Sequence, residues 1–201
     1  MIGAIELTPA VLLSDDGLGI ADADRPDGMH IAVRAIRSDR LLDAAIDYAV
    51  ACAKSHGRFS PYTDGGVVLK CGGEVIVSPD CCDLEEGLDD WLSLVRNRPK
   101  DWMRVHNGHR TGAARVVDDV VELKLEQPSE VDAIGPFVTV ELAFGPLDVA
   151  VDIAIRERRE FATRLERRLR QRDWPDAGAV AATVAGINGE LGLRSDGQVA
   201  P

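Results

Sequence analysis

The sequence predicts an α+β fold, in which an antiparallel sheet built from hairpins is covered on one face by helices. Two observations lead to this class. First, β-branched segments are paired around turn residues: 67–71 and 74–77 flank Gly72 and Gly73, and a glycine pair suits the positive φ angles of a primed hairpin turn. Second, segments with helical spacing lie between the strand pairs. The longest, 147–172, would reach about 39 Å, enough to cross a whole sheet.

The elements in the first part of the chain follow from local patterns. Residues 1–13 alternate loosely and predict a strand, whereas the acidic, turn-rich stretch 14–28 predicts a loop. Alternating apolar residues over 29–36 predict a half-buried strand. Ser38 stands where it can cap a helix that ends near Ser55.

The later elements are predicted in the same way. Asp83 is placed to cap a second helix ending at Arg98, with Glu86 three positions on, as in a capping box. A second hairpin is expected over 113–127 and a further strand over 137–144.

The final helix and the domain limits complete the predicted fold. Residues 1–175 are expected to form one domain, and 176–201 an appendage with a short helix and a frayed end. The buried stripe of the long helix is expected to follow steps of four residues, at Val149, Ile153, Phe161, Leu165 and Leu169.

Composition and charge limit the classes of partner. The chain has 201 residues, of which 45% are hydrophobic and 28% charged, with a net charge of −11. These proportions are typical of a soluble globular protein. The negative charge opposes binding to nucleic acid or anionic membranes and favours a basic protein partner. Eight arginines lie within 156–172. Several of them stand four residues from an acid, which indicates a solvated helix face rather than a phosphate site.

Several compartments and enzyme classes are disfavoured. No apolar run approaches the length of a membrane span, and Met1–Leu13 lacks the basic region of a secretory signal. We therefore expect a cytoplasmic protein with reduced thiols. The motifs of P-loop ATPases, Rossmann dehydrogenases, nucleophile-elbow hydrolases and HExxH metalloproteases are absent from the sequence.

Carboxylates gather around the start of the second helix and predict a docking surface for a basic partner. The following segment, Trp102–Arg110, extends this surface if Trp102 is exposed, whereas a buried Trp102 is a core residue. The predicted partner-binding residues are Asp80, Asp83, Glu85, Glu86, Asp89, Asp90, Trp102, His106 and His109.

The thiols and imidazoles allow a different interpretation. Four such groups can form a tetrahedral zinc site, although their spacing is not that of a standard zinc knuckle. A thiol enzyme is a further alternative, because Cys82 precedes a helix whose free amides favour a thiolate, while the neighbouring Asp83 opposes it. The residues of this metal or thiol alternative are Cys71, Cys81, Cys82, His106 and His109.

One part of the chain carries a recognisable pattern, which consists of Tyr62-Thr63-Asp64-Gly65-Gly66, the hairpin, Pro79-Asp80-Cys81-Cys82-Asp83-Leu84, Trp91 and Gly108-His109. This pattern lies within residues 59–110 and resembles a loosely defined group of uncharacterised bacterial proteins. Some of those are similar to immunity proteins, the cytoplasmic inhibitors paired with secreted toxins. The resemblance assigns no toxin-contact residue and implies no catalytic activity.

The sequence therefore predicts a non-enzymatic cytoplasmic binding protein. The resemblance implies an inhibitor of the immunity type, whose acidic surface blocks a basic toxin or enzyme. No cofactor is expected, and zinc belongs only to the metal alternative. A third alternative is a scaffold protein whose long helix mediates self-association. The sequence does not set the oligomeric state.

Overall fold

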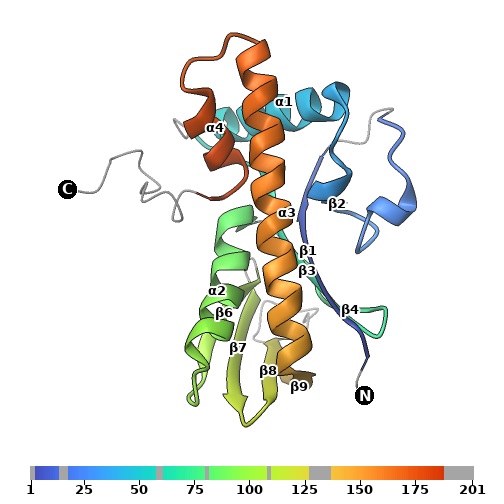
Figure 1. The fold of residues 1–201 in the computed structure, drawn as a ribbon, viewed down its shortest axis with the longest axis vertical. Coiled ribbons are helices and arrows are strands. Elements are labelled where there is room, and N and C mark those ends of the chain that lie inside the picture. Colours follow the sequence, from blue (N-terminus) through green and yellow to red (C-terminus); the bar gives the residue numbers. More distant parts are fainter. Residues whose placement is uncertain are drawn as a thin grey trace, which may run out of the picture.

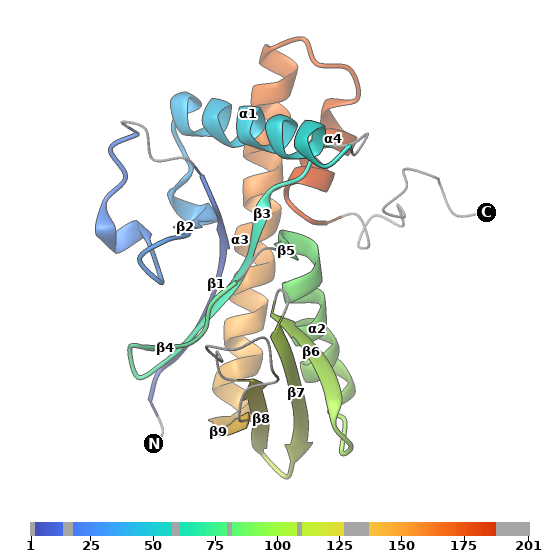
Figure 2. The ribbon, with the colours of Figure 1, turned by 180° about the vertical axis from the view of Figure 1, so that it is seen from behind.

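The chain is organised around one long helix, α3 (Phe144–Gln171), which runs along most of the molecule. Both sheets lie behind this helix in Figure 1 and in front of it in Figure 2. The computed structural model describes residues 3–13, 18–57, 61–79, 82–107, 110–126 and 137–187. The predicted α+β class, with antiparallel sheets and a long C-terminal helix, is confirmed.

The first sheet has the strand order β2-β1-β3-β4, and β5 also pairs with β3. Its strands are β1 (Ile5–Val11), β2 (Ile31–Ala32), β3 (Asp64–Cys71), β4 (Glu74–Val77) and β5 (Cys82–Asp83). The turn between β3 and β4 contains Gly72 and Gly73 at φ angles of 62° and 87°. The predicted primed hairpin is therefore confirmed.

The second sheet is a four-stranded meander in the order β6-β7-β8-β9. Its strands are β6 (Met103–Asn107), β7 (Arg110–Val117), β8 (Val120–Glu126) and β9 (Phe137–Ala143). The β7–β8 hairpin turns at Asp118 and Asp119, where Asp118 has a φ of 54°. The sequence predicted this hairpin and the strand that follows it.

The other helices are α1 (Asp39–Ser55), α2 (Leu84–Asn97) and α4 (Ala177–Val184). The Ser38 side chain accepts a hydrogen bond from the Leu41 amide, which confirms the predicted N-cap of α1. Helix α3 begins three residues earlier than expected and includes Pro146 in its first turn. A proline fits there because an amide in the first turn has no acceptor within the helix.

The strand predicted over 29–36 is wrong for most of its length. Only Ile31–Ala32 pairs with β1, and Val33–Ala35 forms a single 3-10 turn. The carbonyls of Val33 and Ile36 accept hydrogen bonds from the Arg164 guanidinium, at 2.8 Å and 3.1 Å. A side chain from α3 thus binds main-chain groups that an extended sheet strand would use.

Two hydrophobic clusters share α3. The first surrounds the N-terminal half of the helix and joins the two sheets to α2, whose Trp91 is almost fully buried. The second surrounds the C-terminal half, where α1, β2 and α4 enclose Phe161 and Leu165. Figure 2 shows α1 crossing α3 at this end. Helix α4, which the sequence placed in an appendage, contributes Ala177 and Ala181 to this cluster.

The buried face of α3 differs from the predicted stripe. Phe161, Leu165 and Leu169 are buried as expected. Val149 and Ile153 are instead 60% and 39% exposed, which corrects the prediction for the first half of the helix. Residues one or two positions away face the core there: Leu147, Ala150, Val151, Ala154 and Ile155. Steps of four residues drift around a helix of 3.6 residues per turn, so one long stripe cannot stay on one face.

Matched substitutions test this orientation. Val151→Ala removes two methyl groups from a fully buried site and should lower the free energy of unfolding by about 2 kcal/mol. Val149→Ala, at an exposed site on the same helix, should change it by less than about 0.5 kcal/mol. Chemical denaturation of both variants measures the difference. Equal losses would mean that the helix is rotated relative to this structure.

Candidate functional site

Only part of the predicted acidic surface can be placed. Three of the predicted residues lie outside the described part of the chain: Asp80, Cys81 and His109. The side chains of five others are also outside it: Cys82, Asp83, Glu85, Glu86 and His106. Asp89 is described, and its carboxylate forms an ion pair of 3.2 Å with the fully buried Arg158 of α3. Asp90, the next residue, is half-buried. Asp89 therefore helps to hold α2 against α3, and its carboxylate is already engaged within the chain.

Trp102 adopts neither of the two expected positions. It is half-buried, and two cations contact its ring: the Arg115 guanidinium carbon lies 4.6 Å from the ring centroid and Lys124 Nζ lies 4.1 Å from it. Arg115 also forms a 2.6 Å ion pair with Glu122. These residues lie on the face of the second sheet opposite the hydrophobic cluster, because Val116 and the other inward residues alternate with them. This face carries both signs of charge, because Glu122 and its cross-strand neighbour Glu141 lie on it beside Arg115 and Lys124.

The thiols of the metal alternative are held apart by the first sheet. Cys82 pairs with Gly65 near the start of β3, whereas Cys71 is the last residue of that strand. Gly65 and Cys71 are six residue steps apart along the strand, about 20 Å of chain. Because zinc–thiolate bonds are about 2.3 Å long, Cys71 and Cys82 cannot bind one ion together. Among the residues that the structure describes, no group of three or more His, Cys, Asp or Glu could hold a metal ion.

A polar cluster joins α1 to the start of β3. The Tyr48 hydroxyl donates to Asp64 Oδ2 at 3.0 Å, and the Cys52 thiol donates to the same oxygen at 3.6 Å. Burial, together with the Asp64 charge, raises the pKa of both Tyr48 and Cys52. Cys52 is thus a protonated, buried thiol and not an activated nucleophile.

A second polar cluster, which the sequence did not predict, contains Asp27, His30 and Ser78. The Asp27 carboxylate accepts hydrogen bonds from the Ser78 hydroxyl and from His30 Nδ1, the latter at 2.7 Å. The Asp27 and His30 side chains are 4% and 3% exposed. The carboxylate lies between the hydroxyl and the imidazole, so the imidazole cannot serve as the base of a Ser-His-Asp triad. The cluster instead ties the acidic loop to the end of β4.

Several arginines in and just after α3 bind groups of other elements. Arg168 binds Asp43 of α1 through two hydrogen bonds of 2.8 Å and 2.6 Å, which lowers the pKa of Asp43. Arg172 reaches Asp43 and Asp47 at 3.3 Å and 3.0 Å. With Arg164, these side chains fix α1 and the 33–36 turn to α3. They act as connections between elements, which spacing along one helix cannot reveal.

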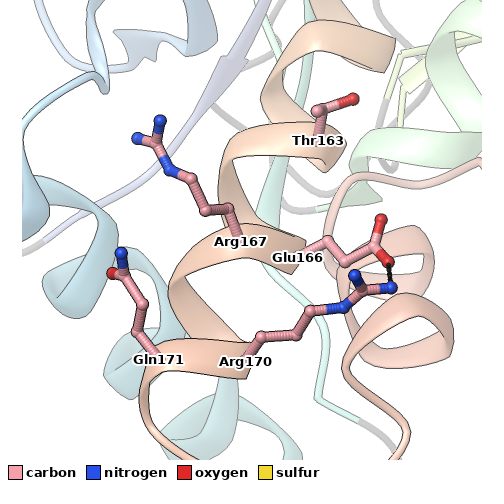
Figure 3. Close-up of a pocket in the computed structure, with 5 residues that line it drawn as sticks. All are labelled: Thr163, Glu166, Arg167, Arg170 and Gln171. Atoms are coloured by element: carbon pink, nitrogen blue, oxygen red, sulfur yellow. Dashed lines mark hydrogen bonds and ion pairs between the residues drawn. The ribbon is translucent and has the colours of Figure 1, made fainter.

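A depression of about 440 Å³ lies along the outer side of α3. Figure 3 shows its lining residues, Thr163, Glu166, Arg167, Arg170 and Gln171. The Arg170–Glu166 ion pair of 2.5 Å confirms one of the predicted pairs four residues apart. All the lining residues come from a single helix, so the depression has one wall and does not enclose a ligand.

The end of the molecule away from α1 and α4 carries exposed carboxylates. They come from β1, β4, β9 and the first turns of α3, which lie at the lower end in Figure 1. None of them forms an ion pair with a described residue. We call this set the acidic end, and it consists of Glu6, Glu74, Glu141, Asp148 and Asp152. Three of these elements, β4, β9 and α3, also carry large exposed apolar side chains: Val75, Phe137, Val138, Val149 and Ile153.

Two cavities open at the acidic end. The larger, about 730 Å³, lies between the β3–β4 hairpin and β9, and Glu74 and Glu141 line it. The smaller, about 230 Å³, follows four consecutive residues of β1, Ile5–Thr8, with Ala150 and Ile153 of α3 on its other side. Carboxylates, apolar side chains and concave surface therefore occur together at this end. The sequence shows only the individual residues, which lie far apart along the chain.

The buried Asp27 carboxylate should make stability depend on acid pH. Hydrogen bonds from Ser78, His30 and the Met29 amide outweigh the effect of burial and lower the pKa of Asp27 to about 2. Because this pKa lies below the unfolded value of 3.8, the stabilisation is complete above about pH 4 and is lost as pH falls through 2. The loss should be about 2 kcal/mol in the free energy of unfolding. Asp27→Asn should remove this dependence, and the exposed control Asp22→Asn should retain it, in denaturant titrations at several pH values.

Comparison with known proteins assigns no function to the chain, so the function has to be inferred from the geometry of the described residues. The chain matches no protein-family model, no curated protein and no solved structure. In the described part of the chain, none of the helices combines the length and apolar character needed to cross a bilayer. The similarity of residues 59–110 to immunity proteins thus stays a prediction.

Proposed function

We propose that this chain is a non-enzymatic binding protein that engages a basic protein partner through the acidic end, as an immunity-type inhibitor does. The observation that carries the proposal is the group of five exposed carboxylates without a described ion-pair partner, placed among exposed apolar side chains. Interfaces commonly combine an apolar centre with a charged rim, so both components of a protein-binding surface are present.

The distribution of charge supports a basic partner. The net charge is −11, and the arginines concentrate in the C-terminal half of α3. Arg164, Arg168 and Arg172 bind groups of α1 and of the 33–36 turn at that end. The carboxylates at the other end form no ion pair with another described residue. The resulting field would orient a cationic protein toward the acidic end and raise its association rate.

The exposed apolar side chains would supply affinity that charge alone does not provide. Solvent-exposed ion pairs contribute little affinity, typically below about 1 kcal/mol each. Burial of Val149, Ile153 and Phe137 in a complex would contribute roughly 25 cal/mol for each Å² of apolar surface removed from water. In this proposal, charge directs the encounter and apolar contact holds the complex. Steric occlusion of the partner's basic active site is then sufficient for inhibition.

The acidic end replaces the start of α2 as the principal surface of this proposal. Asp89 is bound to Arg158, and the Trp102 ring is already in contact with Arg115 and Lys124. The similarity of residues 59–110 to immunity proteins supports a toxin as the partner.

A charge-reversal experiment tests the proposal. The full chain, immobilised, is exposed to the soluble proteins of its own cells, and a retained basic protein is purified for affinity measurements at low and high salt. We expect binding that weakens with salt, and an affinity at least about tenfold lower for Glu141→Lys/Asp152→Lys.

The control variant is Asp22→Lys/Glu160→Lys, which makes the same change in net charge at two exposed sites outside the acidic end, one in the 3-10 turn Asp22–Asp24 and one in the C-terminal half of α3. It should bind within about twofold of the parent chain, because only long-range charge has changed. Circular dichroism confirms that both variants fold. If no basic protein is retained, or if both variants lose affinity equally, the proposal is wrong.

A further inference from the structure

The outer edge of β9 offers a specific way of binding, and this inference rests on the proposed function. We propose that the basic partner contributes an extended segment, with alternating basic and apolar residues, which pairs antiparallel with the edge of β9 that faces the β3–β4 hairpin. Figure 2 shows β9 and this hairpin in the lower half of the molecule. Adding a strand to an open sheet edge is an established mode of peptide recognition.

The direction of the main-chain groups of β9 follows from its pairing with β8. The register is continuous over Phe137–Ala143, and the next amide, that of Phe144, donates to Asp119 O at 2.9 Å. Phe144 and Asp119 extend the same register by one pair. Main-chain groups alternate between the two sides of a strand, so the even-numbered residues of β9 bond to β8. The amides and carbonyls of Thr139 and Glu141 therefore point to the other edge.

In the described part of the chain, that edge is open. β9 is the last strand of its sheet, and no described strand pairs with its other side. The strand is exposed over most of its length: Phe137, Val138, Thr139 and Glu141. It contains no proline, lysine or register irregularity, which are features that often block strand addition at a sheet edge. The outward amides and carbonyls are therefore available to an added strand.

Space for an added strand lies beside this edge. Thr139–Glu141 line one side of the cavity of about 730 Å³, and Cys71, Glu74 and Ile76 of the β3–β4 hairpin line the other. This volume lies within the usual range of ligand pockets, about 300–1,000 Å³. Three consecutive residues of β9 line the cavity, although successive side chains point to opposite faces of a sheet. The cavity therefore faces the edge of the strand and not only one of its faces.

The apolar residues of the segment would complete the first hydrophobic cluster. Cys71, Ile76 and Val140 pack against that cluster but are only half-buried, and all three line the cavity. Val140 shares its face of the sheet with the buried Leu142. Residues directly opposite each other on neighbouring strands have side chains on the same face. Apolar residues opposite Val138 and Val140 would therefore lie over the half-buried part of the cluster and exclude water from it.

The other face of β9 selects basic residues. Glu141 lies on that face, and neither Glu141 nor Glu74 across the cavity forms an ion pair with a described residue. Lys124, which lies opposite Thr139 on β8, is held over the Trp102 ring at 4.1 Å. A basic residue of the segment opposite Thr139 or Glu141 would lie on the same face as the Glu141 carboxylate. Basic and apolar residues should therefore alternate along the segment, as the side chains of β9 alternate between its faces.

Nuclear magnetic resonance of the full chain tests the pairing directly. The probe is a seven-residue peptide of alternating valine and lysine, with valine at both ends, acetylated and amidated. We expect saturable shifts of the Thr139 and Glu141 amide signals and slower hydrogen exchange at both. In this register the lysines exchange ladder hydrogen bonds with β9, whereas the valine amides point away. N-methylation of the three lysine amides should weaken binding by about tenfold or more, and the same change at three valine amides by less than about threefold.

Two matched variants locate the contact without changing charge. Thr139→Pro removes an amide hydrogen that points away from β8, so the ladder between β8 and β9 keeps its hydrogen bonds, and proline is tolerated in an edge strand. Thr139→Val keeps the amide and the branched shape. The peptide should bind about tenfold more weakly to the Thr139→Pro variant, and within about twofold of the parent affinity to the Thr139→Val variant. Circular dichroism confirms that both variants fold.

Several outcomes would overturn the inference. Equal effects of the two methylation patterns, a larger effect at valine, or unchanged Thr139 and Glu141 amide signals would show that the edge is not used in this way, even if Glu141→Lys/Asp152→Lys still weakens a basic partner. A dimer of this chain in light scattering that Thr139→Pro converts to monomer would assign the edge to a second copy. Conversely, edge pairing with the peptide, without any effect of the charge reversals on a natural partner, would support strand addition and contradict the proposed function.

Discussion

The attachment of α3 to both hydrophobic clusters is the constraint on which the rest of the structure depends. Phe161 and Leu165 are enclosed by one cluster, and Val151 is enclosed by the other. Guanidinium groups add directional contacts at the C-terminal end, where Arg168 binds Asp43 and Arg164 binds two carbonyls. Hydrophobic burial is non-directional, so these hydrogen bonds fix the position of α1 along the helix.

The same contacts decide which charges face outward. Arg168 and Arg172 are matched by acids of α1, so part of an apparent basic stripe becomes an internal connection between helices. The acids of β1, β4, β9 and the start of α3 have no such partners among the described residues. A net charge spread over the sequence thus becomes polarised in space, and polarisation rather than total charge gives a surface its preference for a partner.

The short length of β2 arises from a similar competition. Residues after Ala32 could have continued β2 along β1, but Val33–Ala35 turns instead, and the carbonyls of Val33 and Ile36 bind Arg164. Beyond the short β2, α3 packs against β1, and Leu7 and Pro9 are buried. A sheet edge that is covered in this way is protected from pairing with another chain.

The sequence by itself determined the local elements: the Gly72-Gly73 turn, the Ser38 cap and the Asp118–Asp119 hairpin depend on residues close together in the chain. The candidate site was not predictable in this way. Whether Ile153 is buried depends on the neighbours of α3, and the placement of Glu74 and Glu141 in the lining of one cavity depends on the packing of distant segments. Such contacts have no local signature, because they are set by which apolar surfaces meet and which charges they bring together.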